Sequence, residues 1–455
     1  MNPAEAVRTP WLPAVTALGL GFIWRLLLVL QSPVAFSFDG FQRWAGRDHV
    51  LIQDWPPVTQ IVLWLTAQAG GELLAARVVM CLISGLAAAA GTLLAQRLAA
   101  AAYGERPALW AGWTFAVASA YAHWAAWGTV FYQESTFLLV LFSGLWLAAR
   151  GNLRTADLVI GLLGLVRYEG WPCVLLYLAW RRDRRALVAL WGALVWAAIR
   201  GFGVEGYAAS PVNFADWEGL VERFALAAWL ADLLELVRRL GEVGGWVWWG
   251  LGAVAVSLHW RSSLVKLLAL QTLAQLGATM AWVAGLEVVT SRMMVIPVVM
   301  VAVLGASAVP ALARWPRSGW SLVVALAVLL GFQLVEGRDR MRAETRHFAP
   351  EAAAVVEMGR CPGCRWWVLP RRGLGTRARH DGCEVLQGIS SLRHGQDFFC
   401  SSWVTDDWAE AGAGTDGTVR WDAAAKLYRV ERHLPGASPA PAASSPAASL
   451  PVAVP

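Results

Sequence analysis

The sequence predicts an α-helical polytopic membrane protein, with about 11 membrane segments and a small C-terminal soluble, Cys-containing domain. The 455-residue chain is 57% hydrophobic and only 15% charged, whereas soluble domains carry roughly 25% charged residues. Apolar segments long enough for helical spans recur over most of its length. The 28 Trp and 43 Gly are also typical of membrane helices and their interfaces.

The first apolar segment, Trp11–Leu30, is too long for the apolar region of a signal peptide, and no small-residue cleavage site follows it. We therefore expect a first membrane helix that is retained. Arg25 lies inside this helix and must reach the interface or be paired.

The membrane domain is expected to cover residues 1–336, with outside loops at 31–72 and 204–245. After Pro56 and Pro57, residues 58–71 are too few to span and predict an interfacial or re-entrant helix. Further spans are expected at about Leu73–Leu98, Ala108–Trp124, Phe131–Ala149, Leu158–Val166, Gly170–Trp180, Leu187–Phe202, Trp246–Trp260, Leu264–Leu286, Met293–Leu312 and Trp320–Val335. The fourth and fifth of these are short, and we interpret them as a helical hairpin that stops short of full crossing.

The charged residues between these spans predict an orientation. Arginines and lysines gather in alternate loops, which favours a cytoplasmic N-terminus. These basic residues are Arg150, Arg154, Arg181, Arg182, Arg184, Arg185, Arg261, Lys266, Arg314 and Arg317. The predicted location is a bacterial inner (plasma) membrane, with the first loop and the C-terminal domain outside. The net charge of +6 is thus explained by basic residues in the cytoplasmic loops. The absence of a basic recognition module argues against nucleic-acid binding.

The loop at 204–245 contains apolar residues at helical spacing with charges between them, which predicts a helix on the membrane surface. Such a helix serves either as a packing lid or as a wall of a lipid-substrate cleft.

Residues 337–434 are more charged and predict a non-cytoplasmic soluble domain. Two disulfides, a zinc site and a redox CxxC are all compatible with its four cysteines, and an oxidising compartment favours disulfides. These cysteines are Cys361, Cys364, Cys383 and Cys400, whereas Cys81 and Cys173 lie in membrane segments. The Pro/Ala-rich tail, 435–455, is expected to be disordered.

Several ionisable side chains fall within or beside membrane segments, where their cost makes function the first hypothesis. By the predicted topology they share the outer face: Asp39, Glu134, Arg167, Glu169 and Arg292. Singly, each is explained as an interfacial anchor or structural ion pair, and Glu134 as an acid favoured by a helix N-terminus. Together they suit group transfer, since a carboxylate can accept a hydroxyl proton and arginines can bind a leaving phosphate.

The order of these motifs resembles the GT-C superfamily of membrane glycosyltransferases, in the branch with protein O-mannosyltransferases and lipid A aminoarabinose transferases. The motifs are an acid in the first outside loop, Trp-Pro-Pro before a helix, a Glu opening a later span, Arg-Tyr-Glu-Gly, and Ser-Arg before an apolar run. The resemblance covers roughly residues 12–312. It implies an inverting hexosyl- or mannosyltransferase-like enzyme that moves a sugar from a polyprenyl-phosphate donor to a lipid, glycan or protein acceptor.

Carried over by position, the resemblance implies that Asp39 is the catalytic base and that Glu134 orients the acceptor or a metal. Arg167 and Arg292 would contact the donor phosphate. Many relatives have two adjacent acids in the first loop, but Gly40 follows Asp39 here, so a divalent cation (Mg or Mn) stays open. Asp48 and Asp54 are possible substitutes for the missing acid. Glu169, Asp54 and His49 are further candidate substrate-binding residues, although His49 and His123 also suit plain interfacial positions.

Two other functions compete with glycosyl transfer. A transporter or flippase of a lipid-linked sugar would place charges near the midplane within internal repeats, and no repeat is evident. A scaffold that presents the Cys-rich domain leaves the gathered charges without a role.

Overall fold

The computed structural model describes the helical region and short strands near the C-terminus. The described residues are 11–32, 43–44, 50–51, 56–201, 233–234, 236–238, 240, 246–286, 291–312, 318–347, 368–369, 399–401, 417–422 and 427–432. The chain divides into two compact units, Met1–Ala352 and Ala353–Pro455, and each is described by itself.

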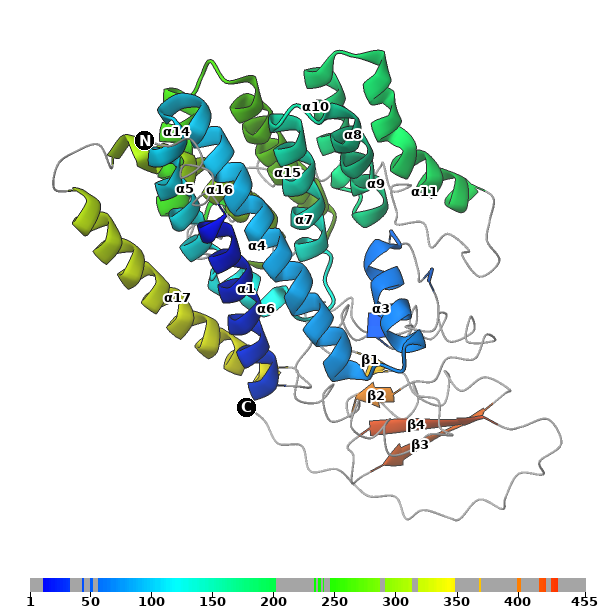
Figure 1. The fold of residues 1–455 in the computed structure, drawn as a ribbon. Coiled ribbons are helices and arrows are strands. Elements are labelled where there is room, and N and C mark those ends of the chain that lie inside the picture. The colour runs from blue at the N-terminus through cyan, green and yellow to red at the C-terminus, as the bar shows by residue number, and fades with distance from the viewer. Residues whose placement is uncertain are drawn as a thin grey trace. The chain divides into compact units, whose positions relative to one another are not determined.

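The first unit is a bundle of helices (Figure 1). Its first half contains α1 (Leu12–Gln31), α3 (Val58–Gln68), α4 (Leu73–Tyr103), α5 (Glu105–Ala118), α6 (Ala122–Trp127) and α7 (Glu134–Ala149). Its second half contains α8 (Leu153–Gly161), α9 (Leu163–Val166), α10 (Gly170–Arg181), the 3-10 helix η1 (Arg184–Leu190), α11 (Trp191–Gly201), α14 (Trp246–Leu258), α15 (Ser263–Leu286), the 3-10 helix η2 (Ser291–Met294), α16 (Val295–Leu312) and α17 (Ser318–His347).

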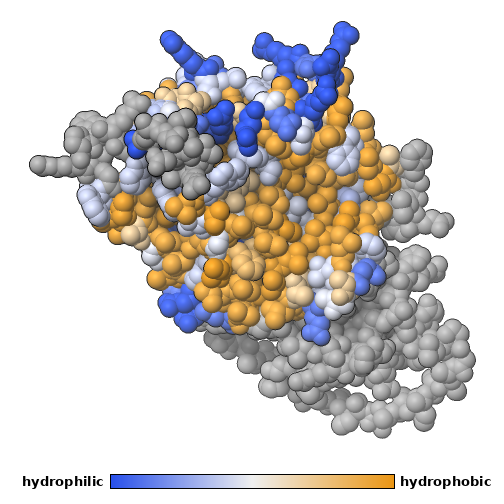
Figure 2. Space-filling model, viewed as in Figure 1, coloured by the Kyte–Doolittle hydropathy of each residue, from blue (hydrophilic) through white to orange (hydrophobic). Residues whose placement is uncertain are grey.

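Apolar side chains cover most of the visible face of this unit, and hydrophilic residues gather toward its ends (Figure 2). Four helical segments of the described chain are long and apolar enough to cross a membrane: Leu12–Gln31, Leu73–Tyr103, Arg292–Leu312 and Trp320–Ala343. α7 and α14 are shorter apolar helices. The protein is therefore an integral membrane protein, as the sequence predicted.

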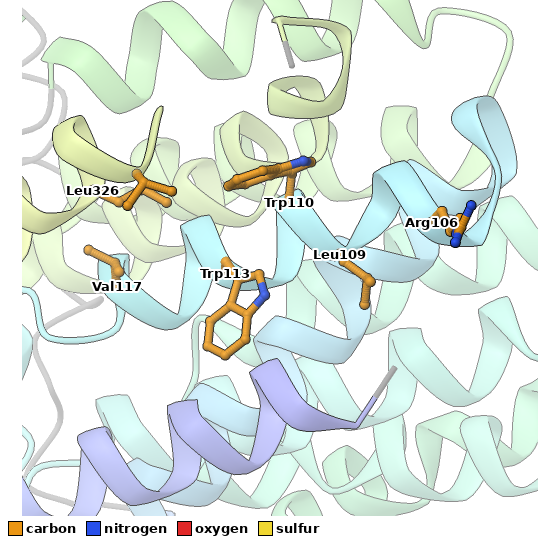
Figure 3. A pocket seen from close by; sticks show the side chains of 7 residues that line it. Arg106, Leu109, Trp110, Trp113, Val117 and Leu326 are labelled. Atoms are coloured by element: carbon orange, nitrogen blue, oxygen red, sulfur yellow. The ribbon is translucent and has the colours of Figure 1, made fainter. Parts of the chain in front are cut away.

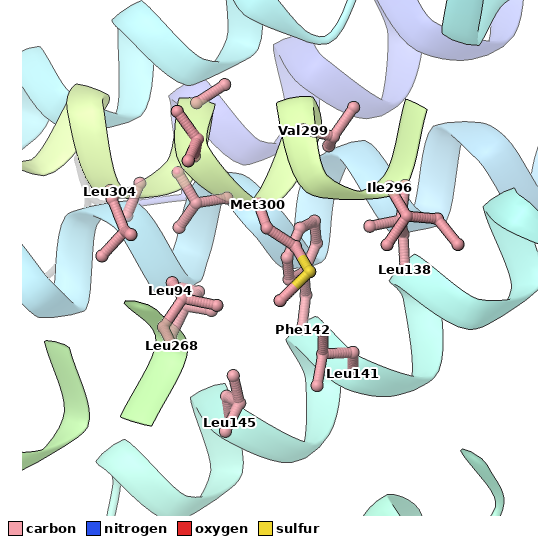
Figure 4. Packing of buried hydrophobic residues seen from close by; sticks show 14 of the residues in the cluster. Leu94, Leu138, Leu141, Phe142, Leu145, Leu268, Ile296, Val299, Met300 and Leu304 are labelled. Atoms are coloured by element: carbon pink, nitrogen blue, oxygen red, sulfur yellow. The ribbon is translucent and has the colours of Figure 1, made fainter. Parts of the chain in front are cut away.

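The core of the bundle is built around α16. Of the most apolar stretch of each helix, 89% is buried inside the bundle for α16 and 11% for α17. The helix α16 is therefore central and α17 is peripheral. α16 packs against α4, α5 and α14. Figure 4 shows Met300 of α16 beside Phe142 of α7 in this core. Because lipid tails are as apolar as these side chains, this core is stabilised by van der Waals packing between the helices and not by removal of side chains from water.

Small residues let α1 and α4 approach closely. A Cβ added to Gly21 would lie 3.2 Å from the Cα of Gly85, and one added to Gly85 would lie 3.0 Å from the carbonyl oxygen of Leu18. Such contacts between small residues are a common way for membrane helices to pack.

Arg25 neither reaches the interface nor pairs with a carboxylate. It is fully buried, and its guanidinium donates to the carbonyls of Gly21 at 3.0 Å and Ser119 at 3.1 Å. It also lies 4.7 Å from the centre of the Trp124 ring. The segment expected as one helix, Ala108–Trp124, breaks after Ala118, and the break supplies the Ser119 carbonyl that the buried arginine needs.

The predicted short elements around the first loop and the hairpin are helical. α3 ends before Gly70, whose φ of +74° is the left-handed conformation that favours glycine. α8, α9 and α10 are short, as expected for the hairpin. α17 continues past Val335, the expected end of the last span, to His347, because the charged residues that follow are themselves good helix formers.

The loop at 204–245 lies largely outside the described residues; positions 233–234, 236–238 and 240 are helical. In the second unit, β1 (Val368–Leu369), β2 (Phe399–Ser401), β4 (Leu427–Arg432) and β3 (Gly417–Asp422) form a sheet in that order. β1 pairs with β2 in parallel, and the other pairs are antiparallel. Cys400 lies in β2, whereas Cys361, Cys364 and Cys383 lie outside the described residues.

Candidate functional site

Four of the predicted site residues come from distant parts of the sequence and sit at helix ends. Glu134 is the first residue of α7, where a negative charge is favoured by the helix dipole. Arg167 ends α9 in an extended conformation, and Glu169 directly precedes α10. Arg292 lies in η2, immediately before α16. Each side chain is therefore fixed by the start or end of a packed helix.

The four side chains form one charge cluster. Arg167 donates from Nη1 to Oε1 of Glu134 at 2.6 Å, and from Nε and Nη2 to the two carboxylate oxygens of Glu169 at 3.1 and 2.7 Å. Arg292 donates from Nε to the same Glu134 oxygen at 2.9 Å. Two guanidinium groups thus share one carboxylate oxygen, and the charges of the cluster sum to zero.

Burial differs within the cluster. The side chain of Glu134 is 2% exposed, that of Arg167 is 11% exposed and that of Arg292 is 21% exposed. At Glu169, burial acts to raise the carboxyl pKa, but the charge and hydrogen bonds of Arg167 outweigh burial and lower the pKa below its ordinary value. Glu169 is therefore held as a carboxylate by Arg167.

Two neighbours that the sequence analysis did not single out support the cluster. The guanidinium carbon of Arg292 lies 3.5 Å from the centre of the Tyr132 ring, a cation–π contact. Gln275 of α15 donates from Nε2 to the backbone carbonyl of Glu169 at 2.6 Å. Gln275 had a signal, since a polar amide inside an apolar segment needs a partner. No sequence signal distinguished Tyr132 from the many other aromatic residues of the chain.

Of the remaining candidate residues, the structure describes His123. Asp39, His49 and Asp54 lie outside the described residues. His123 is buried, and its Nε2 lies 3.9 Å from Glu336 of α17. The ring of Tyr121, two residues earlier, lies 5.4 Å from the His123 ring, and the two planes are tilted by 32°.

A divalent cation does not fit the described cluster, because Glu134 and Glu169 are both bound by guanidinium groups. Within the described part of the chain, no group of three or more His, Cys, Asp and Glu side chains lies close enough to hold a metal ion. The carboxylates of this cluster therefore bind arginine side chains.

A second buried carboxylate lies at the other end of α10. Asp157 accepts from Nε and Nη2 of Arg181 at 3.1 and 3.2 Å and from the hydroxyl of Tyr177 at 2.7 Å. The 12 residues of α10 separate Arg181 from Glu169 by about 18 Å along the helix axis. The Asp157–Tyr177–Arg181 interactions join α8 to α10, and we interpret them as structural.

An apolar groove of about 500 Å³ lies between α5 and α17 (Figure 3). Trp110 and Trp113 of α5 and Leu326 of α17 line it, with Arg106 at one end. No residue of the charge cluster lines this groove, so it is separate from the candidate site.

Comparisons with known proteins agree with the fold. No family model and no curated protein matches the sequence. Among solved structures, ArnT from Cupriavidus metallidurans in the apo state matches with a TM-score of 0.53 and 13% identity, over 91% of this chain and 97% of that one. The same ArnT bound to undecaprenyl phosphate matches with a TM-score of 0.53, 14% identity and equal coverage. This likeness shows that the chain has an ArnT-like fold, which agrees with the fold expected from the resemblance drawn from its motifs.

Proposed function

We propose that the chain is a membrane glycosyltransferase that takes a sugar from a polyprenyl-phosphate donor. The observation that carries this proposal is the charge cluster, in which residues 134, 167, 169 and 292 meet at the ends of packed helices. The GT-C-like fold supports it, as does the undecaprenyl phosphate bound to one of the similar structures. The acceptor is a hydroxyl group of a lipid, glycan or protein on the non-cytoplasmic face.

In the proposed reaction, the acceptor oxygen attacks the anomeric carbon of the sugar. The bond between that carbon and the phosphate oxygen breaks, and the phosphate leaves with the electron pair. Attack from the side opposite the phosphate inverts the anomeric centre. Asp39 takes the acceptor proton as general base, and an arginine stabilises the charge that develops on the leaving phosphate.

The geometry favours different roles for the two arginines. Arg167 makes three hydrogen bonds to carboxylates, so we assign it to holding Glu134 and Glu169 in place. Arg292 uses Nε for Glu134 and is the more exposed of the two. We therefore assign the phosphate contact to Arg292, and Glu134 orients its guanidinium plane.

The described part of the first loop contacts α3, and α3 contacts the first turn of α7, which begins at Glu134; these contacts support the role of Asp39. The carbonyl of Arg43 accepts from Nε2 of Gln60 at 3.1 Å, and the hydroxyls of Thr59 and Thr136 are 3.5 Å apart. Since Asp39 precedes Arg43 by four residues, covalent geometry keeps their Cα atoms within about 14 Å. Asp54 and His49 belong to the same loop and are proposed as further substrate contacts.

Binding of undecaprenyl phosphate to the full chain in lipid nanodiscs tests the phosphate contact. Arg292→Gln should weaken binding by about tenfold to 10²-fold, because it removes charge-assisted hydrogen bonds. Undecaprenol, which lacks the phosphate, should bind the wild type and the variant equally. Arg181→Gln is the matched control, since it removes another partly buried arginine paired with a carboxylate. Equal weakening by Arg292→Gln and Arg181→Gln would contradict the assignment.

Transfer itself is tested with Asp39→Asn in membranes supplied with a panel of polyprenyl-phosphate sugars. The variant should insert and bind undecaprenyl phosphate as the wild type does, yet transfer no sugar. Retained transfer would exclude Asp39 as the base.

A further inference from the structure

The turn between α6 and α7 (residues 129–133) connects the charge cluster with the first loop. Arg77 of α4 is fully buried and donates from Nε to the Thr129 carbonyl at 3.2 Å and from Nη2 to the Thr129 hydroxyl at 3.4 Å. Its Nη1 donates to the carbonyl of Ser32, just after α1. One buried arginine thus joins the start of the first loop to the start of the turn.

Two further contacts follow at alternate positions of the turn. The ring of Phe131 stacks on Trp44, with centroids 5.8 Å apart and planes at 18°. Gln133 donates from Nε2 to the carbonyl of Pro56 at 3.2 Å. Positions 129, 131 and 133 of the turn are therefore connected to three points of the first loop, namely Ser32, Trp44 and Pro56.

The backbone of Phe131 has a φ of +64°, a left-handed conformation that bulky residues adopt rarely and that surrounding contacts must hold. Those contacts are present, since Phe131 is fully buried in a cluster with Trp44, Leu63 and Met80. The next residue is Tyr132, whose ring lies under Arg292. Three residues after Phe131, Glu134 contacts the same guanidinium.

We propose that Tyr132 is a positioning residue for the phosphate contact of Arg292, and that the Trp44–Phe131 stack fixes the turn that carries it. The inference rests on the proposed function for the nature of the ligand. Tyr132 and Glu134 then bound Arg292 on two sides, one by its ring face and one by a carboxylate. Trp44 acts at a distance, through the backbone conformation of Phe131.

The test measures undecaprenyl phosphate binding to the full chain in nanodiscs. Tyr132→Leu should weaken binding by about three- to thirtyfold, the range expected for a lost cation–π contact. Tyr132→Phe keeps the ring and should remain within about twofold of the wild type, because the ring face and not the hydroxyl makes the contact. Equal binding by Tyr132→Leu and Tyr132→Phe would overturn the role of Tyr132.

The role of the stack is tested with Trp44→Leu, which keeps an apolar side chain in the cluster. It should weaken binding like Tyr132→Leu, and the double variant should be no weaker than either single variant, because both act on Arg292 through one turn. Trp146→Leu is the matched control: Trp146 also belongs to an aromatic pair, with Trp11 at 6.3 Å, but at the far end of α7. If the fold losses of binding caused by Trp44→Leu and Tyr132→Leu multiply in the double variant, the two residues act independently, and the proposed connection through the turn is wrong.

Amide hydrogen exchange across residues 128–134 gives a readout that needs no ligand. Trp44→Leu should speed exchange there by about three- to tenfold, the range for one lost aromatic pair, whereas Trp146→Leu should not. Unchanged exchange in Trp44→Leu would overturn the anchoring role even if binding falls. If the wild type fails to bind undecaprenyl phosphate while the exchange result holds, the proposed function fails and the anchor stands.

Discussion

Glu134→Gln is the sharpest perturbation of the charge cluster, because one carboxylate oxygen serves both arginines. The substitution keeps the size of the side chain and changes the sum of the cluster charges from zero to +1. Arg167 loses the carboxylate at its Nη1 but keeps its two hydrogen bonds to Glu169, whereas Arg292 loses the carboxylate at its Nε. Removing one partner of a buried ion pair costs about 3–5 kcal/mol, and the partial exposure of Arg292 places the loss near about 3 kcal/mol.

A double-mutant cycle separates the pair from the rest of the site. Glu134→Gln and Arg292→Gln should each destabilise the protein, and the double variant should lose less than the sum by about 1–3 kcal/mol. The measurement is reversible chemical unfolding in detergent micelles. Asp157→Asn is the control, because it removes a buried carboxylate from another arginine and should show no coupling to Arg292→Gln. Additive losses for Glu134 and Arg292 would refute the reasoning.

Two further predictions concern charge and oxidation. Because the folded pKa of Glu169 is lowered, its contribution to stability is present above the ordinary carboxyl pKa of about 4.3 and is lost as the pH falls through the folded value. Glu169→Gln should therefore flatten the acid limb of a stability-versus-pH curve, and an unchanged limb would count against the Arg167–Glu169 pair. In the second unit, disulfides should block four cysteines to alkylation in mass analysis of the non-reduced protein. These cysteines are Cys361, Cys364, Cys383 and Cys400. Free thiols or bound zinc would contradict the disulfide prediction.

The membrane fold and the convergence of four charged residues were both predictable from the sequence. Charged side chains are costly in apolar segments, so Glu134 and Arg292 stood out against the residues around them. Their meeting was expected, because the predicted topology puts both residues at one membrane face. The pairing itself did not follow, since sequence spacing does not show that Arg167 would bind Glu134 as well as its neighbour Glu169.

Other features were beyond sequence reasoning for physical reasons. A buried arginine was expected to need the interface or a carboxylate, yet Arg25 and Arg77 use backbone carbonyls that become available where helices break or end. Apart from the Thr129 hydroxyl, the acceptors are main-chain atoms, which every residue carries, so no residue type marks them. The left-handed backbone of Phe131 is equally hidden, because glycine or asparagine is the usual mark of that conformation.

Charge balance decides how a phosphate can be recognised at this site. Two arginines without acids would be strongly unfavourable in apolar surroundings, and Glu134 and Glu169 remove that cost before any substrate arrives. If the proposed function holds, the four described side chains offer a donor phosphate no net positive charge, and they would bind it through directed hydrogen bonds. Glu134 engages Nε of Arg292 and Tyr132 covers one face of the guanidinium, so the orientation of the guanidinium is set in advance. In the proposed reaction, this pre-set orientation would lower the barrier to transfer, because the guanidinium assigned to the leaving phosphate would need no reorganisation.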